Sequence, residues 1–351
     1  MGVVGGGISG LETAWFMTDL GAAHVVLLEA GPHPGGKLRT EPLAGLPLES
    51  GPDGFLPGDA AVALCEEIGL GPDLVEARTT DAYVWTGGEL RRLTAQDSPR
   101  GASPDRLLTI RGGLRSLVEA LESRLTGVDV RCGAEVVDVR RGAADGTFLL
   151  AMRSAPPVTV DRVVLAIPAP ASARLLARVA PGVAAMLAGI RYLDMSVINL
   201  VYPGSPWRLP GSGFLAGAGA GLLISGCTWL TSKWPHLASS DVTAIRVTVG
   251  GRGGAEWTSI DDAALIARAH EELCTVVGVD PAPCEAQVVR WQPALADPRC
   301  LDRSLVRAAE RAAREAGVLL AAGGYLGGGV ASCIAEAAIV AAEAGTPRDL
   351  E

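Results

Sequence analysis

The sequence lacks the cysteine and histidine patterns that metal sites and disulfide frameworks require. Its seven cysteines are dispersed without a CxxC pair, and none of its four histidines stands in HxH or HExxH spacing. An odd, dispersed set of cysteines is typical of reduced thiols in a cytosolic protein. We therefore expect a cytoplasmic protein that holds no metal ion.

Basic clusters, a nucleophile motif and a leader are also missing. No block of Lys or Arg interrupts a chain of net charge −9, which argues against nucleic acid as a partner. No G-x-S-x-G motif occurs, so a hydrolase of the serine type is not indicated. The chain enters an apolar strand at Met1 without a basic leader, so we expect no signal peptide.

Aromatic residues are scarce, at 4% of the chain, whereas glycine is abundant, with 45 residues among 351. A composition rich in Ala, Val, Leu and Gly suits an α/β protein with tight turns between strands and helices. A chain of this length exceeds one simple core, so we expect two domains.

The stretch "GVVGGGISGLETAWFMTDLGAAHVVLLEAG" contains a glycine pattern typical of dinucleotide binding, Gly5-x-Gly7-x-x-Gly10. An apolar strand precedes it, a helical pattern follows, and a second strand at 25–28 ends in Glu29. Gly5 would make the tight turn, Gly7 would admit a pyrophosphate, and Gly10 would let the helix pack closely. Glu29 would accept hydrogen bonds from a ribose. FAD and NAD share this pattern, so it does not choose between them.

The next stretch, "GPHPGGKLRTEPLAGLPLESGPDGF", adds the diglycine Gly35-Gly36. Together, the dinucleotide motif, "GGKLRT" and "ESGPDGF" resemble the protoporphyrinogen oxidase branch of the flavin amine oxidase superfamily. The resemblance implies FAD as cofactor. It also implies a Rossmann-like α/β domain, with a parallel sheet and a β-meander, beside an α+β substrate domain on a mixed antiparallel sheet.

Further matches extend this resemblance over nearly the whole chain. "GGL" at 112–114 resembles a family helix start, and "TWLTSKWPHLA" resembles a segment of the substrate half. "GYLGGGVASC" resembles the terminal FAD signature, with Gly327, Gly329, Cys333 and Ile334 matching and with Ala331 and Ser332 replacing Pro and Asp.

Three departures stand out. The polar linker at 94–106 replaces a helical segment that in the family contributes pocket walls and a membrane-associating surface. "ADPRCLD" replaces a "PQY…GH" element, and Gly54 replaces a serine. A membrane-bound enzyme and the family's usual pocket are therefore disfavoured.

The resemblance divides the chain into a discontinuous FAD domain and a substrate domain. The FAD domain would comprise 1–58, 107–180 and 310–351, and the substrate domain 59–106 and 181–309. The residues expected to contact the cofactor are Gly5, Gly7, Ile8, Ser9, Gly10, Glu29, Ala30, Gly35, Gly36, Lys37, Leu38, Arg39, Gly51, Pro52, Asp53, Val136, Trp291, Gly323, Gly324, Gly329, Val330 and Ala331.

Catalytic residues are harder to assign, because a flavin carries the redox chemistry itself. Lys37 and Arg39 could neutralise the charge of the reduced flavin, or they could simply be exposed. Lys233 and His236 could bind a substrate carboxylate, with His236 as an alternative base, but a solvated strand end is the favoured interpretation of both. Asn199, in "SVIN", stands near the place where amine oxidases carry a lysine beside the flavin.

Three hypotheses of function follow. The first is an FAD-dependent oxidase or dehydrogenase of specialised metabolism, which passes hydride from a small substrate to flavin N5 and is reoxidised by O2. The second is a minimal soluble protoporphyrinogen or coproporphyrinogen III oxidase. The third is a flavin-binding partner protein without turnover. A homodimer is left open.

The apolar run at 318–344 has the length of a membrane span, but it carries five glycines midway. We expect a buried parallel strand at 318–320, a glycine turn at 323–329 that approaches the cofactor, and a helix from Val330. Glu336 and Glu343, seven positions apart, would share one helix face directed at solvent. The run is thus interpreted as part of a flavin site and not as a stable membrane anchor.

Overall fold

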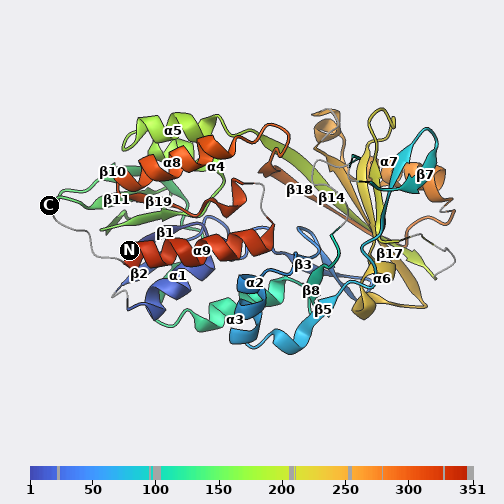
Figure 1. Ribbon diagram of the computed structural model, residues 1–351, viewed down its shortest axis with the longest axis horizontal. Helices are drawn as coiled ribbons and strands as arrows, with labels where there is room; N and C mark the ends of the chain where they lie inside the picture. Colours follow the sequence, from blue (N-terminus) through green and yellow to red (C-terminus); the bar gives the residue numbers. More distant parts are fainter. Residues whose placement is uncertain are drawn as a thin grey trace.

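Two sheets, one parallel and one mostly antiparallel, organise the chain into two lobes (Figure 1). The computed structural model describes residues 1–21, 24–94, 96–97, 104–204, 209, 211–251, 255–278, 280–326 and 329–345. The chain crosses between the lobes several times, so each lobe is assembled from segments that are distant in sequence.

The first lobe is built on five parallel strands in the order β19-β13-β1-β2-β9. Their bounds are β1 Gly2–Val4, β2 Val25–Leu28, β9 Val128–Arg131, β13 Val163–Leu165 and β19 Val318–Leu320. The four strands other than β9 are fully buried and apolar without alternation, because layers of structure cover both faces of the sheet.

Helices α1 (Ile8–Asp19), α2 (Asp59–Glu67), α3 (Arg115–Arg124) and α9 (Val330–Gly345) share one core on the first face of this sheet. The second face is covered by the antiparallel meander β10 (Val136–Arg141), β11 (Phe148–Met152) and β12 (Val158–Val160), together with α4 (Ala169–Leu176), α5 (Pro181–Ala188) and α8 (Arg303–Glu315). The lobe therefore has three layers.

The second lobe is a seven-stranded sheet in the order β18-β14-β17-β16-β15-β6-β7. The strands are β6 Ala82–Thr86, β7 Glu89–Arg92, β14 Tyr192–Pro203, β15 Gly213–Ala216, β16 Ile224–Trp229, β17 Val242–Gly250 and β18 Glu285–Ala296. Helix α7 (Asp262–Val277) packs in the core of this lobe. Asp261 caps its first turn by accepting from the Ala264 N–H. The pairing is antiparallel apart from β6 with β15.

Several short elements complete the two lobes and the segments between them. They are the strand pairs β3 (Thr40–Leu43) with β4 (Leu46–Glu49) and β5 (Leu74–Glu76) with β8 (Leu108–Ile110), the helix α6 (Leu230–Lys233), and the 3₁₀ turns η1 (Gly71–Asp73), η2 (Pro235–Leu237), η3 (Ala255–Ser259) and η4 (Ala322–Gly324).

The predicted fold class is confirmed, including the parallel sheet, the meander and the mixed second sheet. The apolar run at 318–344 forms strand β19, turn η4 and helix α9, as expected. Among the described residues, no helix combines the length and the hydropathy that a membrane crossing requires.

Three local predictions need correction or qualification. From the pattern "VTVDRVVLAIPAPASARLL" one strand followed by a turn at Pro168 and Pro170 would be expected, but the segment at 158–165 forms two strands, and Pro170 lies in the first turn of α4, where its ring fits. Glu336 and Glu343 are only partly exposed, and Glu343 pairs with Arg314 of α8 at 2.6 Å. The division into domains stays a prediction, although α2 packs with the helices of the first lobe.

Candidate functional site

The loop between β1 and α1 has the geometry that a dinucleotide site needs. Gly5 has a φ of +103°, and a Cβ placed there would lie 2.6 Å from the carbonyl oxygen of Ala166. A Cβ on Gly10 would overlap the carbonyl oxygen of Gly5, so the helix packs against the turn only because Gly10 has no side chain. By contrast, no described atom lies within 4 Å of a Cβ placed on Gly7. This open space faces the N-terminus of α1, where a phosphate is stabilised.

Glu29 lies at the end of β2 and is fixed by the backbone around it. One carboxylate oxygen accepts from the Gly6 N–H and the other from the Gly31 N–H, each at 2.6 Å. A carboxylate has further lone pairs, so Glu29 can still accept from ribose hydroxyls. Ala30 is exposed next to it. The segment before Val136 passes close by, since the Ala134 N–H donates to the Glu29 carbonyl at 2.8 Å.

The diglycine segment runs directly beside the dinucleotide loop. The Gly35 N–H donates to the Gly6 carbonyl at 2.7 Å, and Gly35 bridges to Gly7. Gly36 has a φ of +56° and approaches Gly7 so closely that a Cβ would lie 3.2 Å from its Cα. The two glycine motifs, about thirty residues apart in sequence, therefore form one cradle.

The three residues after the diglycine differ in burial and in charge partners. Lys37 is partly buried, and this burial lowers the pKa of its amine, while the nearby Cys333 of α9 opposes the shift. Leu38 is buried. Arg39 is exposed and pairs with Glu41 at 2.6 Å. Of the two cations proposed to neutralise the flavin, only Lys37 faces the helix that completes the cradle.

Helix α9 closes the cradle from the C-terminal end of the chain. Its N-terminal end points toward the second lobe (Figure 1). A Cβ on Gly323 would lie 2.8 Å from the Cα of Cys333, so turn η4 packs tightly on the first turn of the helix. Val330 is buried, whereas Gly324, Gly329 and Ala331 are at least partly exposed. The predicted match at Gly327 lies outside the described residues.

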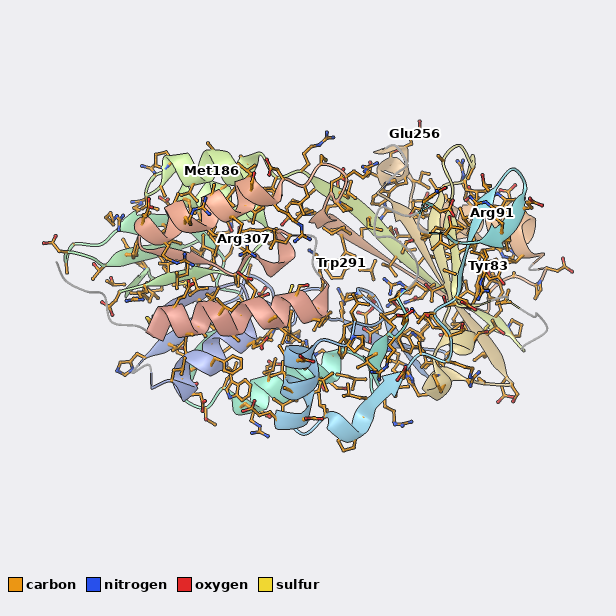
Figure 2. All side chains as sticks on the ribbon, in the orientation of Figure 1. Tyr83, Arg91, Met186, Glu256, Trp291 and Arg307 are labelled. Atoms are coloured by element: carbon orange, nitrogen blue, oxygen red, sulfur yellow. The ribbon has the colours of Figure 1, made fainter. Side chains whose placement is uncertain are left out.

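The loop at 49–53 is attached to three adjacent strands of the second sheet. The Glu49 carbonyl accepts from Asn199 Nδ2 of β14 at 3.1 Å, and the Ser50 carbonyl accepts from Trp291 Nε1 of β18 at 2.7 Å. The Gly51 carbonyl accepts from Arg246 Nη2 of β17. Trp291 lies between the two lobes (Figure 2). We call these three donors the loop clamp.

On the other side of the loop, Gly51 touches the diglycine segment. A Cβ on Gly51 would overlap the Lys37 carbonyl oxygen, and the Ser50 N–H donates to the Arg39 carbonyl at 2.8 Å. The loop clamp therefore connects the glycine cradle of the first lobe to the sheet of the second. Pro52 continues this loop into Asp53.

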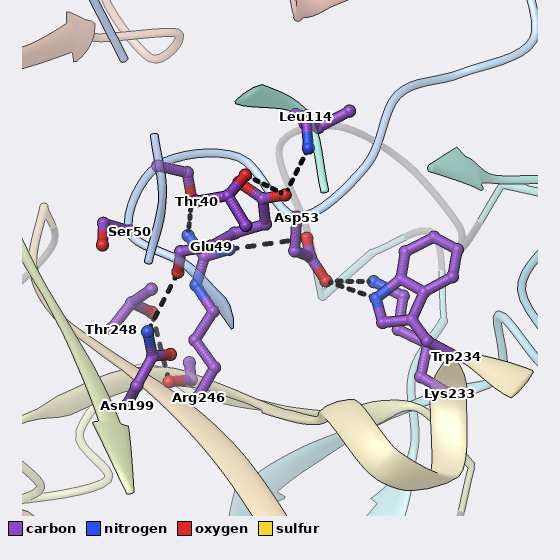
Figure 3. A network of polar contacts seen from close by, with 12 residues as sticks. Thr40, Glu49, Ser50, Asp53, Leu114, Asn199, Lys233, Trp234, Arg246 and Thr248 are labelled. Carbon is purple, nitrogen blue, oxygen red and sulfur yellow. Dashed lines mark hydrogen bonds and ion pairs between the residues drawn. The ribbon is translucent and has the colours of Figure 1, made fainter. Parts of the chain in front are cut away.

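Asp53 is the centre of a buried charge network (Figure 3). It accepts from Lys233 Nζ at 2.7 Å and from Trp234 Nε1 at 3.3 Å, and Arg246 Nη1 lies at 3.7 Å. Burial alone would raise the pKa of Asp53, but Lys233 and Arg246 outweigh it and hold the pKa well below its usual range. Asp53 is therefore a fixed anion.

The interpretation of Lys233 as part of a solvated strand end is wrong. Lys233 lies in the short helix α6, its side chain is only 8% exposed, and its charge is paired with Asp53. The physical reason is that Lys233 is flanked by large buried aromatic side chains, Trp229 at the end of β16 and Trp234 directly after α6, which hold this segment in the core. A buried cation needs an anion, and Asp53 supplies it.

Asn199, the third catalytic candidate, is buried and belongs to the loop clamp. Among the described residues, neither its Oδ1 nor Arg246 Nη1 has a hydrogen-bond partner. Asn199 and Arg246 are directly opposite each other in the β14–β17 register, so their side chains lie on the same face of the sheet. This placement makes Asn199 part of the contact between the loop at 49–53 and the second sheet.

His236 is partly buried in η2, and its Nδ1 has no hydrogen-bond partner within the described part of the chain. Burial and the charge of Arg111 lower the pKa of its ring. The imidazole lines a small pocket together with Glu49 and Asp53. The fully solvated environment expected for His236 is therefore also wrong.

Sequence reasoning missed two residues of this site. Arg246 was detectable as the one charged residue in the otherwise apolar or small-residue strand "VTAIRVTVG". Glu49 gave no such signal. Its buried carboxylate accepts from the Leu114 N–H at 2.6 Å and from the Thr40 hydroxyl at 3.0 Å. Burial raises the pKa of Glu49 to about 7.

Within the described chain, no group of three or more His, Cys, Asp or Glu side chains is placed to hold a metal ion.

The fold and the glycine cradle define a class of two-lobed protein that binds a dinucleotide in a Rossmann-like lobe and carries a second sheet against it. The model of one family, described as "Flavin containing amine oxidoreductase", matches residues 8–107 and 102–344. The chain belongs to this family, which uses FAD as its cofactor, and its sequence relatives lie in the protoporphyrinogen oxidase-like branch. The two matched segments meet at the polar linker, where the sequence departs from the family.

Individual relatives carry names from porphyrin metabolism. The chain is 30% identical over 243 residues to the coproporphyrinogen III oxidase of Mycobacterium bovis, covering 69% of this chain and 51% of the relative. It is 24% identical over 230 residues to that of Bacillus subtilis, covering 64% and 48%. The chain thus spans about half the length of the curated relatives it matches.

A solved structure from Exiguobacterium sp. 255-15, assigned provisionally as a protoporphyrinogen oxidase, has the same fold. It superposes with a TM-score of 0.82 at 21% identity, covering 98% of each chain.

The residues present fit FAD. The cradle is clear of side chains where a pyrophosphate would lie, because Gly7 faces open space and Gly36 contacts Gly7 without a side chain between them. Glu29 keeps lone pairs that can accept from the ribose. Helix α1 begins directly after Gly7, and Cys333 in the first turn of α9 lies beside Ser9 and Lys37 of this region.

Proposed function

We propose that this protein oxidises a small organic substrate by transfer of hydride from a C–H bond to flavin N5, with O2 as the acceptor that restores the cofactor. The loop clamp is the observation that supports this most. It connects the second sheet to Gly51, which touches the diglycine segment of the cofactor lobe. A substrate held on the second sheet would therefore lie against the cofactor.

The assignment of cofactor contacts is part of the proposal. The loop at 5–10 and the start of α1 would hold the pyrophosphate, and Glu29 would hold the ribose. The segments at 35–38 and 51–53 would lie along the ring system, and Trp291 would border it. Lys37 would offset negative charge there. When bound, FAD supplies the two-electron chemistry, and the chain's own residues bind, orient and exclude water.

The buried network around Asp53 supports substrate positioning. Asp53, Lys233 and Arg246 neutralise one another in part, and within the described part of the chain Asn199 Oδ1 and Arg246 Nη1, which lies 3.7 Å from Asp53, form no hydrogen bond. A polar substrate group that accepts a hydrogen bond from Arg246 and donates one to Asn199 would be oriented without a covalent bond. No nucleophile is needed, since the reaction breaks a C–H bond.

Oxidation of coproporphyrinogen III or protoporphyrinogen is the second candidate, and the names of the relatives favour it. The polar linker and the replaced "ADPRCLD" segment favour a different substrate of specialised metabolism. The dispersed thiols support a cytoplasmic location for either activity.

Anaerobic mixing separates these candidates. The purified flavoprotein is mixed without O2 with coproporphyrinogen III, with protoporphyrinogen IX and with a panel of small amines. Bleaching of the flavin absorbance identifies the substrate class, and porphyrin fluorescence marks the second candidate. If none of them bleaches the flavin, and if chemically reduced flavin fails to recover in air, the protein is a flavin-binding partner without turnover.

A further inference from the structure

The chain on both sides of the diglycine is bonded to one residue of helix α3, Arg115. The Arg115 Nη1 donates to the Pro34 carbonyl at 2.6 Å, and the Arg115 backbone N–H donates to the Thr40 hydroxyl oxygen at 3.0 Å. Pro34 stands directly before Gly35-Gly36, and Thr40 begins strand β3 behind them. Arg115 therefore holds both ends of the segment at 34–40, although it was not among the residues expected to contact the cofactor.

The first turn of α3 is a firm support for these two bonds (Figure 3). The Leu114 N–H donates to the buried Glu49 carboxylate at 2.6 Å, and the Thr40 hydroxyl donates to the same carboxylate at 3.0 Å. Glu49 and Thr40 are directly opposite each other in the β3–β4 hairpin. The helix also buries four apolar side chains completely, those of Leu114, Leu117, Val118 and Leu121. The core, and not a bound cofactor, thus sets the position of Arg115.

The guanidinium of Arg115 is oriented by two acids of its own helix. Its Nε lies 3.3 Å from Glu119 Oε1 and its Nη2 lies 3.4 Å from Glu122 Oε2, while Nη1 donates to Pro34. The planar fork of arginine donates in fixed directions, so the three contacts leave the group little freedom. The hydrogen bond to Pro34 has a charged donor, which makes it stronger than a bond between neutral groups.

The segment that Arg115 holds has a backbone that only glycine adopts readily. Gly35 has a φ of +119° and Gly36 a φ of +56°. A Cβ on Gly35 would lie 3.1 Å from Arg115 Nη1, so the guanidinium packs directly against this glycine. Gly35 in turn donates to the Gly6 carbonyl, and Gly36 approaches Gly7. A diglycine has many conformations open to it, and the bonds at its two ends restrict it to the one that closes the cradle.

We propose that Arg115 is a positioning residue that preorganises the diglycine segment for the cofactor. The proposal rests on the proposed function, in which the segment at 35–38 contacts FAD. With the bonds to Pro34 and Thr40 in place, the apoprotein already has the conformation that binds FAD. Without the bond to Pro34, only a fraction of the molecules is competent to bind, and the apparent Kd rises by the inverse of that fraction.

The first test needs no cofactor. Arg115→Met keeps the apolar stem of the side chain and removes the donor to Pro34. Arg124→Met is the matched control, because Arg124 of the same helix also donates to a backbone carbonyl, that of Glu67 in α2 at 3.1 Å. In the apoprotein the Gly35 amide should exchange its hydrogen about tenfold faster in Arg115→Met and at the wild-type rate in Arg124→Met, while both variants unfold at the same urea concentration. Equal exchange of Gly35 in the two variants overturns the proposal.

The second test titrates the apoproteins with FAD. Arg115→Met should bind FAD about tenfold more weakly than wild type, and Arg124→Met should stay within about twofold of it. Arg115→Lys keeps a cation that can donate to Pro34, so its affinity should lie between those of Arg115→Met and wild type. A loss in Arg115→Lys as large as that in Arg115→Met would show that the packing of the helix, and not the hydrogen bond, is what matters.

Gly36→Ala separates this proposal from the proposed function. Its methyl group would lie against Gly7, so it tests the contact of the segment at 35–38 with FAD directly. If Gly36→Ala loses FAD affinity and Arg115→Met keeps it, the role of Arg115 is refuted. If both keep it, the assignment of the segment to the cofactor fails, while the exchange of the Gly35 amide still decides whether Arg115 orders the segment.

Discussion

Two carboxyl groups, the partly buried Asp53 and the buried Glu12, show how the neighbours of a residue set its charge. Asp53 forms ion pairs with Lys233 and Arg246 and accepts a hydrogen bond from the indole of Trp234. These interactions hold its pKa well below the usual range. Glu12 of α1 is 1% exposed, and its Oε2 has no hydrogen-bond partner among the described residues. Burial raises the pKa of Glu12 to about 9. The first group is therefore ionised and the second neutral at pH 7.

Lys233→Met should destabilise the protein because it leaves Asp53 without its closest cation. We expect the free energy of unfolding to fall by about 2–4 kcal/mol at pH 7. The depressed pKa of Asp53 stabilises the fold above the unfolded value, and this contribution is lost as the pH falls through the folded pKa. Since the variant raises that pKa, its acid unfolding should begin at a higher pH.

Urea unfolding at several pH values checks this prediction. Arg106→Met, which breaks an exposed pair with Glu76, is the control and should leave stability unchanged. Equal stability of Lys233→Met and wild type would show that Arg246 alone suffices for Asp53.

Glu12→Gln should stabilise the protein at neutral and alkaline pH. Because the pKa of Glu12 is raised on folding, its contribution is fully present below the unfolded value and is lost as pH rises toward 9. The amide cannot ionise, so the free energy of unfolding should rise by about 1–3 kcal/mol at pH 8 and lose part of its pH dependence between 5 and 9. Denaturation curves across this range test it, and parallel curves for variant and wild type would contradict it.

At the scale of elements, two glycines of one motif have different tasks. Gly10 of α1 touches the Gly5 carbonyl and serves the packing of the helix on the turn. Gly7 precedes the helix at a φ of −71°, which any residue adopts, and faces open space. The first is needed for folding and the second for the ligand.

Gly10→Ala should therefore destabilise the apoprotein by about 2 kcal/mol or more, because the methyl group displaces the turn. Gly7→Ala should leave the free energy of unfolding of the apoprotein within about 0.5 kcal/mol of wild type and weaken FAD binding about tenfold or more. Unfolding of the apoproteins and fluorescence titration with FAD measure the two effects. Equal effects of both substitutions on folding would refute the division of tasks.

Elements whose signals are local were predictable from the sequence. The dinucleotide loop, the hairpin at Gly87-Gly88 and helix α7 each carry their own turn or cap residues, and both hairpin glycines have positive φ. The pair of Asp53 and Lys233 was not predictable, because the two residues are 180 positions apart and nothing local links them. The loop clamp likewise depends on the order of strands in a sheet, which residue patterns do not determine.

At the scale of the whole molecule, the loop clamp joins the two lobes through side chains of three neighbouring strands. Asn199, Arg246 and Trp291 each donate to a different carbonyl of the loop at 49–51. The loop in turn contacts Lys37 and Arg39 beside the glycine cradle. Binding of FAD and the docking of the second sheet are thus expected to stabilise each other.

Trp291→Phe tests this coupling, because it keeps an aromatic ring but removes the donor to Ser50. Leaving the Ser50 carbonyl unpaired should cost about 1–3 kcal/mol. This loss should weaken the contact between the lobes, so FAD should bind about tenfold more weakly. Calorimetry should then resolve two unfolding transitions, where the wild-type holoprotein shows one. Trp85→Phe, in the β6–β7 hairpin at the far edge of the second sheet, should retain one transition and wild-type FAD affinity. A single transition and unchanged FAD affinity in Trp291→Phe would mean that the remaining donors of the clamp hold the lobes together without it.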